Sequence, residues 1–162
     1  LISVAKETGQ TATTVVYENI IKMYSRMLPS SHNNAVWICH PDVMPQLMQM
    51  ALNVGTGGSA IWVNNAVDGV PMTIFGRPVL LTEHAETLGT VGDLYYADLS
   101  FYYIGDRNGL SIASSPHYRF ANGETVWRFT ERLDGGMILD SAITPENGSN
   151  TMSPIVALAT RS

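Results

Sequence analysis

Residues 88–112 read Leu88-Gly89-Thr90-Val91-Gly92-Asp93-Leu94-Tyr95-Tyr96-Ala97-Asp98-Leu99-Ser100-Phe101-Tyr102-Tyr103-Ile104-Gly105-Asp106-Arg107-Asn108-Gly109-Leu110-Ser111-Ile112. The glycine-rich start predicts a turn, and the aromatic run that follows is typical of β-strands. The Asn-Gly pair tolerates positive φ and lies between two strand-like runs, 101–104 and 110–113. The stretch therefore predicts a hairpin that turns at residues 106–109.

The chain before this stretch favours helices. Thr13 or Thr14 can cap a helix that ends at Pro29, with an apolar stripe at Val16, Ile20, Met23 and Met27. Asp42 can cap a second helix that has Pro45 in its first turn and stops at Gly55. The buried face of this second helix would comprise Leu47, Met50, Ala51 and Val54.

Most of the remaining chain favours strands. Residues 35–39 form a short apolar run with β-branched and aromatic members, which predicts a buried central strand. Residues 55–69 are rich in Gly, Asn and Ser and predict an exposed loop or hairpin. Further strands are expected at 72–75, 78–82, 94–96, 99–104, 110–113, 125–132 and 155–160. Helices early and strands late indicate an α+β fold.

Composition narrows the function classes. The 162 residues are 45% hydrophobic, enough for one domain with a genuine core. A net charge of −5 with scattered Lys and Arg argues against specific nucleic-acid recognition. No apolar run approaches the length of a membrane span, no secretory signal opens the chain, and the single cysteine cannot form an internal disulfide, so we expect an intracellular protein without a membrane partner. Residues 1–5 read as a strand already under way, which suggests a fragment of a longer protein.

Candidate chemistry is sparse. Cys39 and His40, with Asp42 to orient the imidazole, invite a thiolate–imidazole interpretation, but adjacent strand residues point to opposite faces. A core cysteine followed by a strand-end histidine is favoured, and a small Cys/His hydrolase stays an alternative. Glu83 and Glu86 flank a histidine and are interpreted as a solvated loop. The four histidines have no metal-ligand spacing, so no catalytic residue, metal or cofactor is expected.

Four pieces of sequence in a fixed order resemble a known family. They are residues 34–41 with Leu47, residues 74–79, residues 88–112, and Phe120 followed by residues 128–135. In this order they resemble the C-terminal half of a tailed-bacteriophage major capsid protein of the Hong Kong 97 type. The resemblance covers nearly the whole chain.

The resemblance implies a non-enzymatic structural subunit of a phage or prophage shell. Most of residues 1–162 would form the axial domain, with one or more peripheral-domain strands near residues 125–135. The family's N-terminal arm, extended loop and spine helix would precede Leu1. The whole protein would assemble into pentamers and hexamers, with scaffold or portal proteins as possible partners. It would reside in the virion capsid and, before assembly, in the cytoplasm of the bacterial host. An encapsulin-like nanocompartment subunit shares the fold and is the main alternative.

The resemblance also suggests where subunits touch. The loop at 55–69 would make a contact near the symmetry axis, and the strand that ends at residue 135 would contribute on the peripheral side. The candidate contact residues are Gly57, Ser59, Trp62, Asn64, Asn65, Asp68, Arg132 and Asp134.

Overall fold

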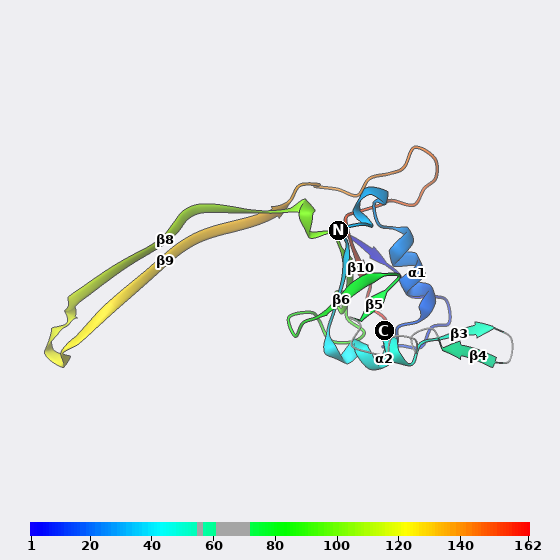
Figure 1. Ribbon diagram of the computed structural model, residues 1–162, viewed down its shortest axis with the longest axis horizontal. Helices are drawn as coiled ribbons and strands as arrows, with labels where there is room; N and C mark the ends of the chain where they lie inside the picture. The colour runs from blue at the N-terminus through cyan, green and yellow to red at the C-terminus, as the bar shows by residue number, and fades with distance from the viewer. Residues whose placement is uncertain (55–56, 61–71) are drawn as a thin grey trace. The chain divides into compact units, whose positions relative to one another are not determined.

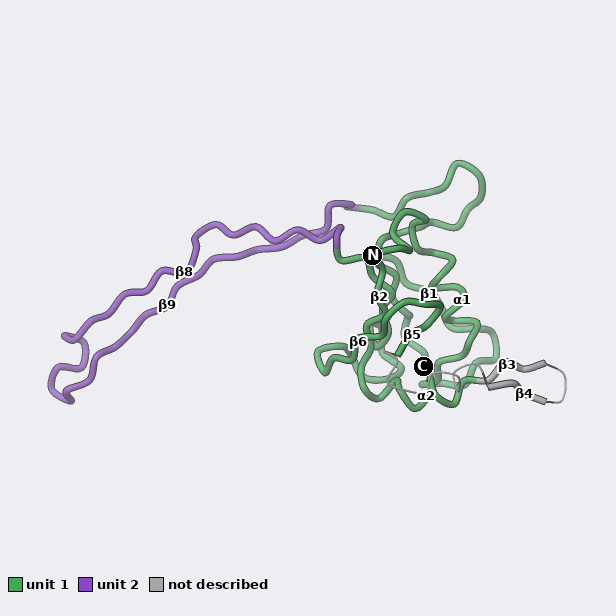
Figure 2. Tube along the Cα trace, viewed as in Figure 1, with its two compact units in different colours: residues 1–99, 141–162 green, residues 100–140 purple. Residues whose placement is uncertain are grey.

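The computed structural model describes residues 1–54, 57–60 and 72–162. The chain divides into two compact units, Leu1–Leu99 with Ser141–Ser162 and Ser100–Asp140 (Figure 2). The first unit contains a sheet and short helices, and the second is a pair of long strands, which confirms a mixed α+β fold.

A six-stranded mixed sheet forms the centre of the first unit (Figure 1). Its strand order is β1-β10-β7-β2-β6-β5. β1 pairs parallel with β10, β2 pairs parallel with β6, and the other neighbours are antiparallel. The strands span Ile2–Val4 (β1), Val36–Cys39 (β2), Thr73–Ile74 (β5), Arg77–Leu81 (β6), Leu94–Ala97 (β7) and Ile155–Leu158 (β10).

The predicted central strand is confirmed. β2 lies between β7 and β6, and Trp37 and Cys39 on one of its faces are completely buried. The Trp37 ring stacks on Tyr96 of β7, with 4.2 Å between ring centroids, and its indole N–H donates to the Ile74 carbonyl over 3.2 Å. This buried indole thus has both an aromatic contact and a hydrogen-bond acceptor.

The first predicted helix exists, but its cap and its end differ. Helix α1 spans Tyr17–Ser25, and its first free N–H, that of Val16, donates to the side-chain oxygen of Asn19 over 3.1 Å. Neither threonine caps it, because the N-cap position is Val16, and the Thr14 hydroxyl instead donates to the Thr11 carbonyl. The helix stops before Pro29, which instead starts a 3-10 turn at Pro29–Ser31. Ile20 and Met23 are buried as predicted.

The second predicted helix exists, with Leu47 and Met50 buried as predicted, but its predicted extent from residue 42 to residue 55 is wrong. A 3-10 turn at Pro41–Val43 leads into the short helix α2, Met44–Met48, whose first turn contains Pro45. His40, rather than Asp42, accepts the N-terminal N–H of that 3-10 turn. Residues Ala51–Val54 form strand β3, which pairs antiparallel with β4, Gly57–Ala60. Pairing between these two segments overrides the helical spacing that residues 51–54 share with Leu47.

The core of the first unit lies on one face of the sheet. Side chains of α1, α2 and the 3-10 turn before α2 pack there against the buried strand residues, with the largest fully buried members at Trp37, Tyr96, Ile20, Met23, Met27, Leu47 and Leu94. No helix in the described part of the chain is long and apolar enough to cross a membrane.

The second unit is a two-stranded antiparallel ribbon. Strand β8 spans Tyr102–Arg119 and strand β9 spans Glu124–Met137, and the two run side by side along their length (Figure 1). A 3-10 turn at Phe120–Asn122 joins them, followed by Gly123 at a φ of 66°. A further 3-10 turn at Leu99–Phe101 precedes β8, where the sequence predicted strand.

The predicted hairpin turn at residues 106–109 is wrong. β8 passes straight through Asn108-Gly109, and neither residue has the positive φ that a two-residue hairpin turn requires. The Asn-Gly pair instead lies where the register shifts, between Asp106 and Asn108 and again between Asn108 and Ser111. A β-bulge explains this position, since it inserts extra residues into one strand without ending it.

Candidate interaction surfaces

The two faces of the ribbon differ in chemistry. Residues that are paired across the two strands share a face, and β9 keeps its alternation from residue 126 to residue 137. One face, here called the apolar face, carries Trp127, Phe129, Leu133 and Met137 of β9 with Tyr102, Ile104 and Ile112 of β8. Its polar members are Glu131 of β9, Asp106 opposite Leu133 and Ser114 opposite Trp127. The other, here called the arginine face, carries Arg128, Thr130, Arg132 and Asp134 with Asn108, Ser111 and Ala113.

The apolar face is open to solvent among the described residues. Trp127 is 59% exposed, Phe129 is 63% exposed and Leu133 is 61% exposed. An isolated two-stranded ribbon is marginal in water, and a contiguous exposed apolar surface marks an interaction site. The ribbon is therefore a candidate contact surface, and this face is its most apolar part.

Two tyrosines lie across glycines near the base of the ribbon. A Cβ built on Gly135 would lie 2.8 Å from ring atoms of Tyr102, and one built on Gly136 would lie 3.3 Å from the Tyr103 ring. The ring over Gly135 lines a hollow of about 290 Å³ together with Ile104 and Leu133. Aromatic side chains packed over glycine pin the register of a ribbon, so these pairs fix which residues face which way.

The predicted contact residues fall into three groups. Arg132 and Asp134 lie two apart on β9, exposed and on the same face. Gly57 and Ser59 lie in β4, opposite Val54 and Leu52. Trp62, Asn64, Asn65 and Asp68 lie outside the described residues.

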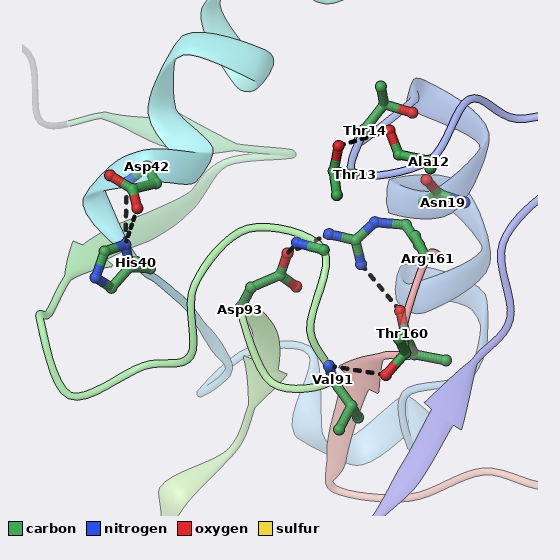
Figure 3. Close-up of polar contacts among 12 residues, drawn as sticks. Ala12, Thr13, Thr14, Asn19, His40, Asp42, Val91, Asp93, Thr160 and Arg161 are labelled. Atoms are coloured by element: carbon green, nitrogen blue, oxygen red, sulfur yellow. Dashed lines mark hydrogen bonds and ion pairs between the residues drawn. The ribbon is translucent and has the colours of Figure 1, made fainter.

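The Cys39–His40–Asp42 arrangement does not form a nucleophilic site. Burial, aided by the nearby Asp93 carboxylate, raises the pKa of the Cys39 thiol to about 11. His40 turns to Asp42 instead: its Nδ1 accepts the Asp42 N–H over 3.2 Å and lies 3.3 Å from Asp42 Oδ2 (Figure 3). A thiol that is buried and protonated at neutral pH is a poor nucleophile, so the geometry gives the hydrolase alternative no support.

The acidic and histidine residues that follow β6 show no catalytic arrangement either. Glu83, His84 and Glu86 are exposed, as a solvated loop would be. Among the residues that the structure describes, no group of three or more His, Cys, Asp or Glu side chains could hold a metal ion.

One polar contact in the first unit was missed by the sequence analysis. Arg161 Nη2 donates to Asp93 Oδ2 in an ion pair whose two side chains are fully buried (Figure 3). The same carboxylate oxygen accepts the Gly89 N–H over 2.9 Å, and Arg161 Nη1 donates to the Ala159 carbonyl over 3.0 Å. The pair ties the segment after β10 to the turn before β7. The two residues are 68 positions apart, so no local spacing could have indicated it.

Comparisons with known proteins agree with this fold. The model of the phage capsid family matches residues 1–147. The capsid of an empty GTA particle, computed with C5 symmetry, is 16% identical in sequence to this chain and superimposes on it with a TM-score of 0.68. The match covers 99% of this chain and 50% of that capsid chain. The capsid of a native GTA particle, also computed with C5 symmetry, is 17% identical with a TM-score of 0.67. This second match covers 99% of this chain and 49% of that capsid chain. This chain thus spans about half the length of those capsid chains. No curated protein matches it.

Proposed function

This chain belongs to the phage capsid family, and we propose that it is part of the structural subunit of an icosahedral shell. The match of the family model to residues 1–147 carries the proposal. The shared fold with two GTA capsid chains supports it over 99% of the chain.

In this proposal the first unit supplies the axial domain and the ribbon supplies the peripheral strands. The apolar face of the ribbon supports this division, because a surface carrying Trp127, Phe129 and Leu133 at about 60% exposure needs a covering layer. In a capsid subunit that layer comes from the assembled particle. Contacts at residues 55–69 near the symmetry axis and at Arg132 and Asp134 are part of the same proposal.

The proposed role is structural and not catalytic. The buried Cys39 thiol, with its pKa raised to about 11, supports this part of the proposal. The subunit would assemble into pentamers and hexamers in the host cytoplasm and end in the virion capsid, with scaffold or portal proteins as further partners. No residue is assigned to a cofactor.

Electron microscopy of the full-length protein tests the proposal. We expect closed icosahedral particles from the purified protein. Mass spectrometry of the particle contents separates the two kinds of shell: a second enclosed protein would identify an encapsulin-like compartment, and its absence is expected for a phage capsid. A full-length protein that stays monomeric across protein and salt concentrations would contradict a shell role.

The axial contact has its own test. Replacing residues 55–69 by a short turn should abolish capsomer formation and leave the sheet of the first unit folded, as judged by circular dichroism. The matched control replaces the segment 144–150, between Ile143 and Thr151, with a glycine-serine segment of equal length and should assemble normally. Unimpaired assembly of the shortened protein would rule out the contact at 55–69.

A further inference from the structure

The arginine face of the ribbon carries two cations that have no partner. Arg128 and Arg132 lie four residues apart on β9 and point to the same face, opposite Ala113 and Asn108 of β8. Within the described ranges neither guanidinium group forms a hydrogen bond or an ion pair, not even with Asp134 on the same face, whereas Arg119 near the ribbon tip pairs with Glu124 at 3.2 Å. The two guanidinium groups are therefore available to another carboxylate.

The surface next to Arg128 is hollowed. A depression of about 430 Å³ is lined by Ala113, Ser114, Ser115, Tyr118, Val126 and Arg128. It lies where the register between the strands shifts, between Ser115 and Arg119, and where small side chains face the arginine. A small apolar floor beside one guanidinium suits a carboxylate-bearing side chain, because the fork of donors on arginine binds both carboxylate oxygens.

The chain itself offers matching acids. Glu83 and Glu86 follow β6, and both are exposed. In the part of the chain that the structure describes, neither carboxylate has a hydrogen bond or an ion pair. The two glutamates are three residues apart and form one exposed acidic segment. The same chain thus carries an exposed acidic segment and an exposed pair of arginines, and neither has a partner among the described residues.

We propose that Arg128 and Arg132 form a carboxylate-binding surface that takes the acidic segment at residues 83–86 of a second copy of this chain. This inference rests on the proposed shell function, which supplies the neighbouring copy. Charge complementarity between the two unpartnered sets selects a second copy as the occupant. The contact would set the register between neighbouring subunits, since charge pairs at an interface act mainly on specificity and on the rate of association.

Charge reversal in the full-length protein tests the inference. The double variant Arg128→Glu with Arg132→Glu should lower the particle yield at least about tenfold, because like charges placed against each other at an interface cost several kcal/mol. Adding Glu83→Arg and Glu86→Arg to that variant should restore the yield. Particle yield is measured by sedimentation and electron microscopy, and circular dichroism confirms that each variant folds.

Arg107→Glu is the matched control, because Arg107 is an exposed arginine of β8 that also has no partner among the described residues. This variant should assemble like the wild type. Normal assembly of the Arg128/Arg132 variant would overturn the inference and leave the shell function standing. If the quadruple variant, which carries all four charge reversals, failed to restore assembly, the assignment of residues 83–86 as the partner segment would be overturned. If the wild-type protein formed no particles, the proposed function itself would fail.

Discussion

Replacing Arg161 by methionine should destabilise the first unit strongly. The Arg161–Asp93 ion pair has both side chains completely buried, so the variant leaves the Asp93 carboxylate without its countercharge and, among the described residues, with the Gly89 N–H as its one remaining hydrogen-bond donor. Removing one partner of such a buried pair costs about 3–5 kcal/mol. Domains of this kind have about 5–15 kcal/mol of stability in total, so the loss would be a large fraction of it.

Urea denaturation followed by circular dichroism measures this loss. Lys22→Met is the matched control, because Lys22 pairs with Glu7 in the same unit at 2.6 Å but its side chain is 52% exposed. An exposed pair contributes about 0–1 kcal/mol, since water already screens the charges. The expected difference between the two variants is therefore about 2 kcal/mol or more.

The double variant Arg161→Met with Asp93→Asn separates a buried charge from a general packing defect. The neutral amide removes the lone carboxylate and keeps an oxygen for the Gly89 N–H, so the double variant should be more stable than Arg161→Met alone. The reasoning is refuted if Arg161→Met costs no more than Lys22→Met, or if the effects of the two substitutions simply add.

Two further outcomes follow from the backbone and from a buried thiol. Gly123→Ala should destabilise the ribbon by about 1 kcal/mol, because Gly123 has a φ of 66°. Gly109→Ala is the control and should have little effect, because Gly109 has no positive φ. Faster proteolysis within residues 100–140 is expected for Gly123→Ala and not for Gly109→Ala. The folded-state pKa of Cys39, about 11, lies above its reference value of 9.0. The protonated thiol therefore contributes its full stabilisation below pH 9, and this contribution is lost as the pH rises to 11. The free energy of unfolding of Cys39→Ala should decline less over that interval than that of the wild type, and parallel curves would contradict the raised pKa.

The sequence predicted best those elements whose burial shows in local pattern. The apolar run at residues 35–39 became β2 in the middle of the sheet, and the helical stripe through Ile20 and Met23 became α1. Its boundaries were less predictable, because the helix start is capped by Asn19, which lies inside the helix, and not by the threonines before it. Likewise Ala51–Val54 fits a helical stripe but forms β3, since a strand partner after it decides the outcome.

The candidate site shows the same limit more sharply. Arg132 and Asp134 could be selected from the sequence through the family resemblance, but their shared face with Arg128 and the hollow beside it depend on the register of β9 against β8. The buried pair of Asp93 and Arg161 depends on a contact across 68 residues. Neither the cross-strand register nor the long-range ion pair produces a residue spacing that can be recognised in a single sequence.

Three Asn-Gly pairs in this chain show why the hairpin was misplaced. Asn108-Gly109, Asn122-Gly123 and Asn147-Gly148 share the same tolerance of positive φ. Only the second joins β8 to β9, because residues 124–137 form one strand that pairs with β8 from Tyr102 to Arg119, and that pairing needs a turn near residue 122. The first pair then falls inside the ladder, where it produces a register shift instead of a turn. A turn-prone dipeptide therefore indicates a place where a ladder can bend, and the length of the partner strand decides whether it ends there.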